Sequence, residues 1–402
     1  MRGASVKTLP DNPNLDHLRQ QAKDLLAGLR DSDPSAALAD AQASLAEQYG
    51  FAGWTELKAE VDRQQGRADV ADPALARDIA ARYDLGQVTG SMRSVARADE
   101  IGRRWSLETD RGRWAVRTTD TWIPIVDVET EVALQEAAVG AGVLLPAPVR
   151  SGSGAIVESI GDHSWRVNRW LRSGPPLSAP VSATLTRELG RILATVHGLA
   201  LPVDRISPWH TMRFAARGWA EMAETAGAKG APWAAALADA VSTLEDLDSV
   251  AGPAAPGLSD APPVLCHNSL GPNNARRAAD GRLAVVGWEH AGGQPPSWEL
   301  GDALTHWTIN PNGGVNTAGA RALLDGYRAV AGTLPPLGMG MFAGAVTSLA
   351  NYVAGQLDHA LTARDEEIRR YQDRSVRHLL AHLPTRAALE RLLDEAVSLS
   401  AG

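Results

Sequence analysis

The hydrophobic period changes twice along this chain of 402 residues. Apolar side chains recur at three-and-four spacing over residues 15–61, alternate over residues 103–119, and return to helical spacing from Ser182 onward. Helical spacing predicts amphipathic helices, whereas alternation predicts half-buried strands. The changes therefore predict a small helical module, then a part built on a sheet with one helix over residues 128–143, and finally a larger helical part.

The alternating segment at residues 103–119 predicts a β-hairpin, because a turn sequence separates two runs with period two. Its strands would share one apolar face, made of Trp105, Leu107, Trp114 and Val116. Two further hairpins are expected over residues 155–171 and 274–287, the second one within the helical part. The predicted class is thus α+β.

A polar segment at residues 62–74 carries Gly and Pro, which is typical of a linker. We therefore expect a helical N-terminal module at residues 1–70, a small lobe based on a sheet at 75–172, and a helical lobe at 173–402.

Composition excludes several classes of protein. A hydrophobic fraction of 44% with 21% charged residues is ordinary for a folded protein, and the net charge of −8 does not favour nucleic acid or an anionic membrane as a partner. The single cysteine, Cys266, rules out a disulfide within the chain, and no apolar run approaches the roughly 18 residues of a membrane span. We expect a cytoplasmic protein.

The N-terminal stretch from "NLDHLRQQAKDLL" to "GFAGWTELKAEV" resembles a short helical module found at the N-terminus of many bacterial proteins. The resemblance covers about 50 residues and implies no chemistry. It implies a packing element or a contact between copies of the chain, so the module is a candidate for homo-oligomer formation.

Three motifs follow in order: "LGRILATVHGLAL" at residues 189–201, "VLCHNSLGPNN" at 264–274 and "AVVGWEHAGGQPPSWELGDAL" at 284–304. On these motifs, residues 75–390 resemble the aminoglycoside phosphotransferase and choline kinase family. The resemblance implies a protein-kinase-like fold of two lobes, a small β-sheet lobe and a larger helical lobe, preceded here by the helical module. It also implies ATP or another nucleotide as a cofactor and a small molecule as the second ligand.

Two acids of the family's motifs are replaced in this chain. The resemblance places Ser269 where the catalytic loop carries the Asp that deprotonates the acceptor hydroxyl, and Gly287 where a second Asp binds Mg²⁺. A serine hydroxyl is no general base near neutral pH unless another base activates it. Because Mg²⁺ requires hard oxygen ligands, Asn274, which matches the family's metal-binding Asn, would hold it almost alone. Little magnesium binding is expected.

The small lobe shows a related change. Arg117 stands at the position of the family's phosphate-binding Lys, and Glu131 matches the helix Glu that pairs with it. Arg keeps the charge of Lys but presents a planar fork. The two residues would form either an ordinary ion pair or part of a nucleotide site.

Four residues of the degenerate loop region remain as candidates for chemistry, and each has a structural alternative. His267 either braces the loop or takes part in catalysis, and Asn274 either pins the loop or contacts a ligand. Glu289 and His290 either bind a ligand or carry acid–base chemistry together, or they are a solvated Glu and a hydrogen-bonded His with no such role.

We therefore interpret the chain as a pseudokinase that binds a small molecule or nucleotide in the interlobe cleft, with phosphoryl transfer lost or strongly impaired. One alternative is an atypical phosphotransferase acting on a hydroxylated small molecule such as an antibiotic, in which Glu289 or Asp302 replaces the lost acids. A second alternative is an enzyme of another reaction type that uses the same cleft with His267, Glu289 or His290.

Overall fold

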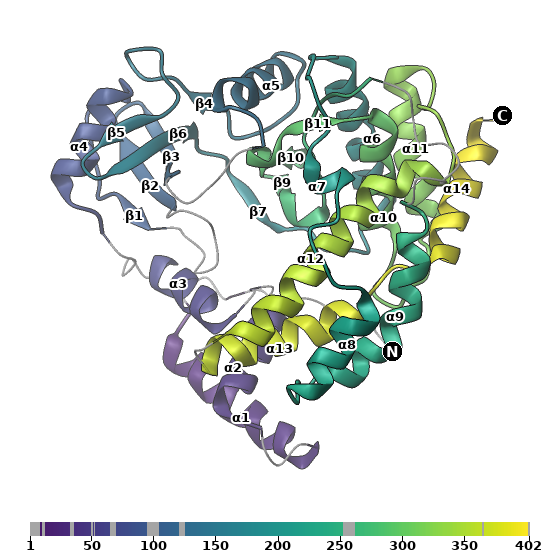
Figure 1. The fold of residues 1–402 in the computed structure, drawn as a ribbon. Coiled ribbons are helices and arrows are strands. Elements are labelled where there is room, and N and C mark those ends of the chain that lie inside the picture. The colour runs from purple at the N-terminus through teal and green to yellow at the C-terminus, as the bar shows by residue number, and fades with distance from the viewer. Residues whose placement is uncertain are drawn as a thin grey trace. The chain divides into compact units, whose positions relative to one another are not determined.

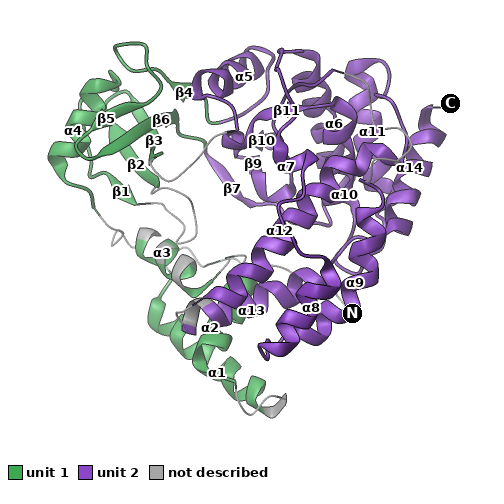
Figure 2. Ribbon diagram, viewed as in Figure 1, with its two compact units in different colours: residues 1–123, 146–171 green, residues 124–145, 172–402 purple. Residues whose placement is uncertain are grey.

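The computed structural model describes residue 9 and residues 13–32, 36–49, 51, 53–64, 70–94, 104–119, 125–251, 262–363 and 366–400. The chain divides into two compact units, coloured separately in Figure 2. Unit 1 comprises residues 1–123 and 146–171, and unit 2 comprises residues 124–145 and 172–402. Figure 1 traces the order of the elements along the chain.

Unit 1 begins with three helices that form a small core of their own: α1 (Leu15–Ser32), α2 (Leu38–Gln48) and α3 (Trp54–Gln64). Leu18, Leu45 and Leu57 are buried in this core, as the helical spacing predicts. A fourth helix, α4 (Pro73–Arg82), starts within the segment expected to be a linker. Asp72 caps it by accepting a hydrogen bond from the backbone N–H of Ala74 at 2.8 Å.

A six-stranded antiparallel sheet makes up the rest of unit 1, with order β1-β2-β3-β6-β4 and β5 paired to β6. Its strands are β1 (Arg93–Ser94), β2 (Arg104–Thr109), β3 (Gly112–Thr118), β4 (Pro148–Val149), β5 (Glu158–Ile160) and β6 (His163–Arg169). The hairpins predicted over residues 103–119 and 155–171 are both present, and Trp105 faces Val116 as expected. One face of the sheet packs its apolar side chains with α4 in a single core.

Unit 2 is mainly helical. Its helices are α5 (Val128–Gly140), α6 (Ala183–Gly198), α7 (Pro208–Thr211), α8 (Trp219–Ala228), α9 (Ala234–Asp248), α10 (Pro296–Thr308), α11 (Thr317–Ala331), α12 (Ala343–Thr362), α13 (Glu366–Ala381) and α14 (Arg386–Ser400). Helices α6 and α11 approach closely, because a Cβ added to Gly190 would lie 1.9 Å from the carbonyl oxygen of Leu323. Such a contact requires glycine at the crossing.

Two small sheets in unit 2 flank the loop at residues 267–274, which contains the motif positions of His267, Ser269 and Asn274. β7 (Ser173–Pro176), β9 (Ala275–Ala278) and β10 (Leu283–Val285) form one sheet, and β8 (Val264–Cys266) pairs with β11 (Gly292–Gln294) in the other. The hairpin predicted over residues 274–287 is present and consists of β9 and β10. None of the helices described is both long and apolar enough to cross a bilayer.

Candidate functional site

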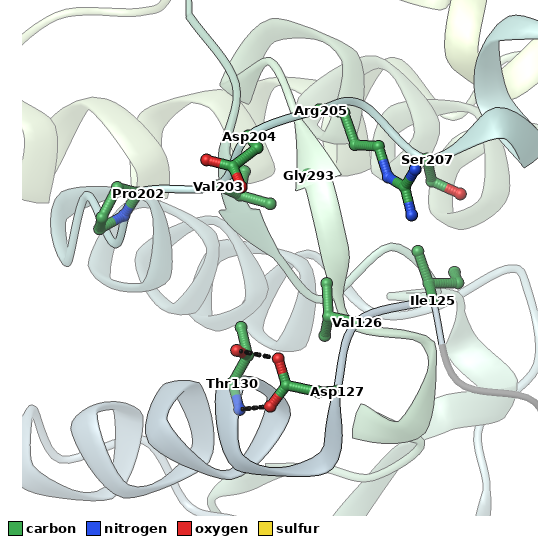
Figure 3. Close-up of a pocket in the computed structure, with 10 residues that line it drawn as sticks. All are labelled: Ile125, Val126, Asp127, Thr130, Pro202, Val203, Asp204, Arg205, Ser207 and Gly293. Carbon is green, nitrogen blue, oxygen red and sulfur yellow. Dashed lines mark hydrogen bonds between the residues drawn. The ribbon is translucent and has the colours of Figure 1, made fainter.

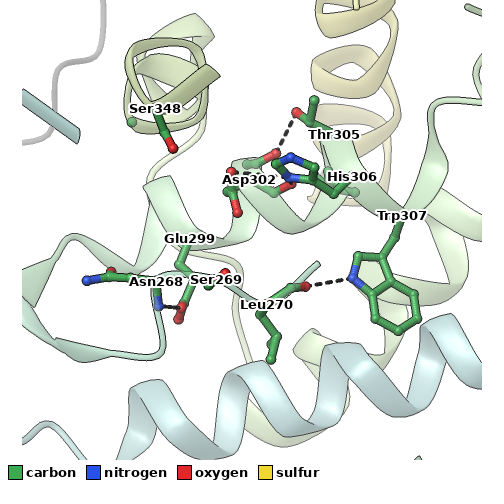
Figure 4. Close-up of polar contacts among 12 residues, drawn as sticks. Asn268, Ser269, Leu270, Glu299, Asp302, Thr305, His306, Trp307 and Ser348 are labelled. Atoms are coloured by element: carbon green, nitrogen blue, oxygen red, sulfur yellow. Dashed lines mark hydrogen bonds and ion pairs between the residues drawn. The ribbon is translucent and has the colours of Figure 1, made fainter. Parts of the chain in front are cut away.

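The loop between β8 and β9, residues 267–274, is held in place by side chains of helix α10. The backbone N–H of Asn268 donates to Oε1 of Glu299 at 2.6 Å, and the indole Nε1 of Trp307 donates to the carbonyl oxygen of Leu270 at 2.7 Å (Figure 4). Asn268 has a φ of +63°, a left-handed conformation that Asn tolerates better than most residues. The loop conformation is therefore specified by its own residues and by two buried side chains of one helix.

A buried polar network extends this support to α6 and α11. The second carboxylate oxygen of Glu299 lies 2.8 Å from Nε2 of His197, whose Nδ1 lies 2.9 Å from the hydroxyl of Tyr327. Burial raises the pKa of Glu299, but the hydrogen bond and charge of His197 outweigh it, so the pKa lies below its ordinary value. Glu299 is therefore an ionised acceptor that fixes the loop.

His267 is buried, and both of its ring nitrogens are used within the loop. Nε2 lies 3.0 Å from the carbonyl oxygen of Val286, and Nδ1 accepts the backbone N–H of Ser269 at 3.2 Å. These contacts fit the neutral tautomer that carries its proton on Nε2, and burial lowers the pKa of His267. His267 thus has the contacts of a residue that braces the loop.

Ser269, Asn274 and Gly287 lie together. The amide nitrogen of Asn274 donates to the backbone carbonyl of Ser269 at 2.8 Å and to its hydroxyl oxygen at 3.0 Å. Gly287 has a φ of +83°, and a Cβ added there would lie 2.7–2.8 Å from the three terminal atoms of the Asn274 amide. The Asn274 side chain therefore lies over the position from which a residue-287 carboxylate would project.

Glu289 and His290 lie on η2 (Trp288–His290), the short helix that follows Gly287, and both are half-buried. Their charges act on the pKa of His267, Glu289 raising it and His290 lowering it. Ser269, His267 and Asn274 therefore contact one another within one loop, and Glu289 and His290 lie near enough to act on the pKa of His267. A catalytic or binding role for these residues stays a prediction, and positions 269 and 287 carry no carboxylate.

The other pair of predicted residues is divided between the units. Arg117 lies on β3 in unit 1, whereas Glu131 lies on α5 in unit 2. Glu131 is buried and its Oε1 accepts from Nε2 of Gln135 at 2.6 Å. Pairing of Arg117 with Glu131 stays a prediction.

Potential metal ligands gather elsewhere among the described residues. Atoms of His197, Cys266 and Glu299 lie within 4.8 Å of one another. All three residues are buried, and His197 bonds to Glu299. Burial raises the pKa of the Cys266 thiol, so the thiol keeps its proton. This group is part of the support of the loop. At Ser269 and Gly287 the described residues do not fit the hard, carboxylate-rich site that Mg²⁺ requires.

A pocket of about 400 Å³ lies at the N-terminus of α5 (Figure 3). It is lined by Ile125, Val126, Asp127, Thr130, Pro202, Val203, Asp204, Arg205, Ser207 and Gly293. Both oxygens of Asp127 are engaged by Thr130, with the backbone N–H at 2.9 Å and the hydroxyl at 2.7 Å, which lowers the pKa of Asp127. The pocket has the size of a small-molecule site, and no motif or pattern in the sequence indicated it.

Asp302 and His306 form an ion pair one turn apart on α10, with 3.3 Å between Oδ1 and Nδ1 (Figure 4). The charge of Asp302 raises the pKa of His306 to about 9. Burial raises the pKa of Asp302, but His306 and more distant histidines outweigh it, so this pKa is lowered. At neutral pH both groups are therefore charged, and Asp302 is engaged by its neighbour.

This pair predicts pH-dependent stability. Because the pKa of His306 rises from 6.5 to about 9 on folding, the contribution is complete below pH 6.5 and is lost as the pH rises through 9. The lowered pKa of Asp302 gives the opposite pH dependence: its contribution to stability is present at neutral pH and is lost as the pH falls. Since half of the His306 side chain is exposed, solvent screening limits the effect to about 1 kcal/mol.

We expect the free energy of unfolding, measured in urea at about pH 6 and about pH 10, to fall by about 1 kcal/mol more in the wild type than in His306→Gln. An equal fall in the two proteins would show that the pair contributes nothing.

A family model described as the phosphotransferase enzyme family matches residues 93–333, which is more than half of the chain. The chain therefore belongs to this family. The resemblance seen in the motifs is confirmed, and so is the α+β, protein-kinase-like fold.

Curated relatives include two homoserine kinases. That of Xanthobacter autotrophicus is 26% identical over 264 residues, and that of Paramagnetospirillum magneticum is 24% identical over 270 residues. Each match covers 65% of this chain and 78% of the relative.

Among solved structures, a spectinomycin phosphotransferase in complex with ADP and spectinomycin is similar with a TM-score of 0.52 and 12% identity, covering 82% of this chain and 98% of that one. An amicoumacin kinase in complex with AMP-PNP and Ca²⁺ has a TM-score of 0.52 and 13% identity, with 82% and 99% covered. At these identities the likeness shows the fold alone.

Proposed function

We propose that this chain is a member of the phosphotransferase family that binds a nucleotide or another small molecule and in which phosphoryl transfer is lost or strongly impaired. One observation carries the proposal: Ser269 and Gly287 occupy the two motif positions at which carboxylates are needed, and the Asn274 amide lies over Gly287. Phosphoryl transfer depends almost entirely on positioning and on neutralising charge. The loop of this chain is well braced, so it can still position a ligand. Because it lacks both acids, it cannot neutralise charge through a bound metal ion.

The magnitude of the loss supports the proposal. Removing one catalytic acid or base typically costs about 10²- to 10⁴-fold in rate. Loss of the metal's charge stabilisation comes on top of this, because Mg²⁺ supplies several kcal/mol of transition-state stabilisation in such reactions.

An atypical phosphotransferase acting on a hydroxylated small molecule is the second candidate. It is favoured by the curated relatives, which are homoserine kinases, and by nucleotides in complexes of the structural neighbours. Glu289 would have to replace a lost acid, because Asp302 already pairs with His306. An enzyme of another reaction type that uses Glu289 and His290 beside His267 is a third candidate.

The three candidates separate in one set of assays on the full chain. ATP with Mg²⁺ or Mn²⁺ is offered together with homoserine and hydroxylated antibiotics, and release of ADP is measured. The proposal predicts no release dependent on an acceptor. Metal-dependent release that is abolished in Asn274→Ala would support the second candidate and contradict the proposal. Turnover of a small molecule without ATP, lost in Glu289→Gln or His290→Ala, would support the third.

A further inference from the structure

The pocket at the N-terminus of α5 has one wall that is fixed to the small sheet of β8 and β11. Residues 202–207 form this wall, and both of its ends are anchored. Pro202 forms a bridge to β8, and the backbone N–H of Ser207 donates to the carbonyl oxygen of Gly293 on β11 at 3.0 Å. A Cβ added to Gly293 would lie 2.0 Å from the carbonyl oxygen of Arg205, so this close packing requires glycine. The wall is therefore formed before any ligand binds.

The opposite wall is the start of α5. Asp127 caps the helix through Thr130, which engages both carboxylate oxygens. Ile125 lies over β11, because a Cβ added to Gly292 would lie 2.8 Å from its Cγ2 and 2.6 Å from Nδ2 of Asn268. The pocket therefore borders the loop that contains Asn268, but none of its lining residues belongs to that loop.

Two opposite charges on the first wall are unpaired in the part of the chain that the structure describes. Asp204 and Arg205 are exposed, and neither side chain forms an ion pair or a hydrogen bond with another described residue. Although the two residues are neighbours in the sequence, Figure 3 shows their charged groups pointing apart. They therefore offer separate places for an anionic group and for an ammonium group at one pocket.

The rest of the lining is largely apolar. Ile125, Val126, Pro202 and Val203 contribute aliphatic surface to a cavity of about 400 Å³, which is large enough for a small molecule. Burial of a hydrocarbon chain against such side chains is favourable. A ligand that uses both charges and this surface carries a carboxylate and an ammonium group at the two ends of a short aliphatic chain.

We propose that this pocket is a second small-molecule site, which binds an amino acid whose carboxylate and ammonium groups are separated by a short aliphatic chain. The carboxylate pairs with Arg205, whose planar fork matches two carboxylate oxygens. The ammonium group pairs with Asp204, and the chain lies against Ile125, Val126 and Val203. This inference goes beyond the proposed function and does not depend on it, because the pocket contains none of the motif residues.

The probe is ε-aminocaproate, and its isomer leucine carries the same two charges on neighbouring atoms. Two further probes each lack one charge: caproate has no ammonium group and hexylamine has no carboxylate. Calorimetric titration of the full chain at low salt should show ε-aminocaproate binding at least about threefold more tightly than each of the other three. The factor is modest because the two charged side chains are exposed, and added salt should reduce it.

Substitutions assign each charge to one end of the ligand. Arg205→Gln is expected to weaken binding of ε-aminocaproate about threefold without weakening hexylamine, and Arg205→Lys to have a smaller effect because it keeps the charge. Asp204→Asn should weaken ε-aminocaproate by a similar factor without weakening caproate. Arg277→Gln is the matched control, because it removes an exposed positive charge from β9 in the same unit and should leave the dissociation constant unchanged. Circular dichroism checks that each variant folds.

Failure of ε-aminocaproate to bind at up to about 10 mM would overturn the proposal. Tighter binding of leucine, or equal weakening by Arg205→Gln and Arg277→Gln, would also overturn it. The two proposals fail separately, because none of these titrations involves phosphoryl transfer. Release of ADP decides the proposed function, whereas binding of ε-aminocaproate decides the second site.

Discussion

Replacing Glu299 with alanine is expected to lower the free energy of unfolding by about 3–5 kcal/mol, because it removes one partner of a buried charged network. Glu299 is 1% exposed and bonds both to His197 and to the backbone N–H of Asn268. Without the carboxylate, the His197 ring and the Asn268 N–H would both be buried without this acceptor. The measurement is equilibrium unfolding in guanidinium chloride.

Two variants serve as controls for this result. Glu299→Gln keeps one oxygen that can accept from the Asn268 N–H, but it replaces the oxygen that contacts His197 with an NH₂ group, so its loss should be smaller than that of Glu299→Ala and still measurable. Glu390→Ala removes a surface carboxylate that pairs with Arg386 at 3.0 Å, and should change the free energy of unfolding by less than about 0.5 kcal/mol. A loss in Glu299→Ala no larger than that in Glu390→Ala would mean that the network does not support the loop.

Restoring both acids is the second change with a large expected effect. The double variant Ser269→Asp with Gly287→Asp should gain stabilisation by Mg²⁺ and ATP together that the wild type lacks. It should amount to about 2.7 kcal/mol when the ligand is present at a hundred times its dissociation constant. The φ of +83° at position 287 suits Asp better than most residues. The Asn274 amide must move aside, which is feasible because it is the end of a side chain.

Thermal unfolding with and without MgATP measures this gain. Ser269→Asn with Gly287→Asn is the matched control, because it adds side chains of the same size without charge, and it should gain little. If the acidic double variant shows no more stabilisation than the amide double variant, the loop no longer has the geometry of a metal site. The absence of two carboxylates alone would then not explain why the loop does not bind a metal ion.

Much of the fold could be predicted from local patterns. The hairpin that contains Trp105 and Val116 was predictable because alternation and a turn sequence coincide. Strands β7 and β11 were not, since "SGPP" and "GGQ" contain glycine and proline and no apolar alternation. Helix α4 was missed because its proline-containing start lies in a segment with the composition of a linker.

The candidate site, like the fold, has one part that local patterns predict and another that they do not. Motif spacing brought His267, Ser269 and Asn274 together correctly, because they lie within one loop. The support from His197 and Glu299 was not predicted, since these residues lie 102 positions apart and only tertiary packing joins them. A histidine on an otherwise apolar helix face, and a carboxylate between Trp298 and Leu300, were the signals available in the sequence.

The central claim is that this chain cannot transfer phosphate at the rate of its family. It is tested most directly by mixing the unmodified protein in excess with ATP labelled at the γ-phosphate, Mg²⁺ and a hydroxylated acceptor such as homoserine, and by counting label on the acceptor over time. We predict a rate constant below about 10⁻² s⁻¹, at least about 10²-fold under the 1–100 s⁻¹ typical of kinases. Transfer at about 1 s⁻¹ or faster to any acceptor would contradict the account.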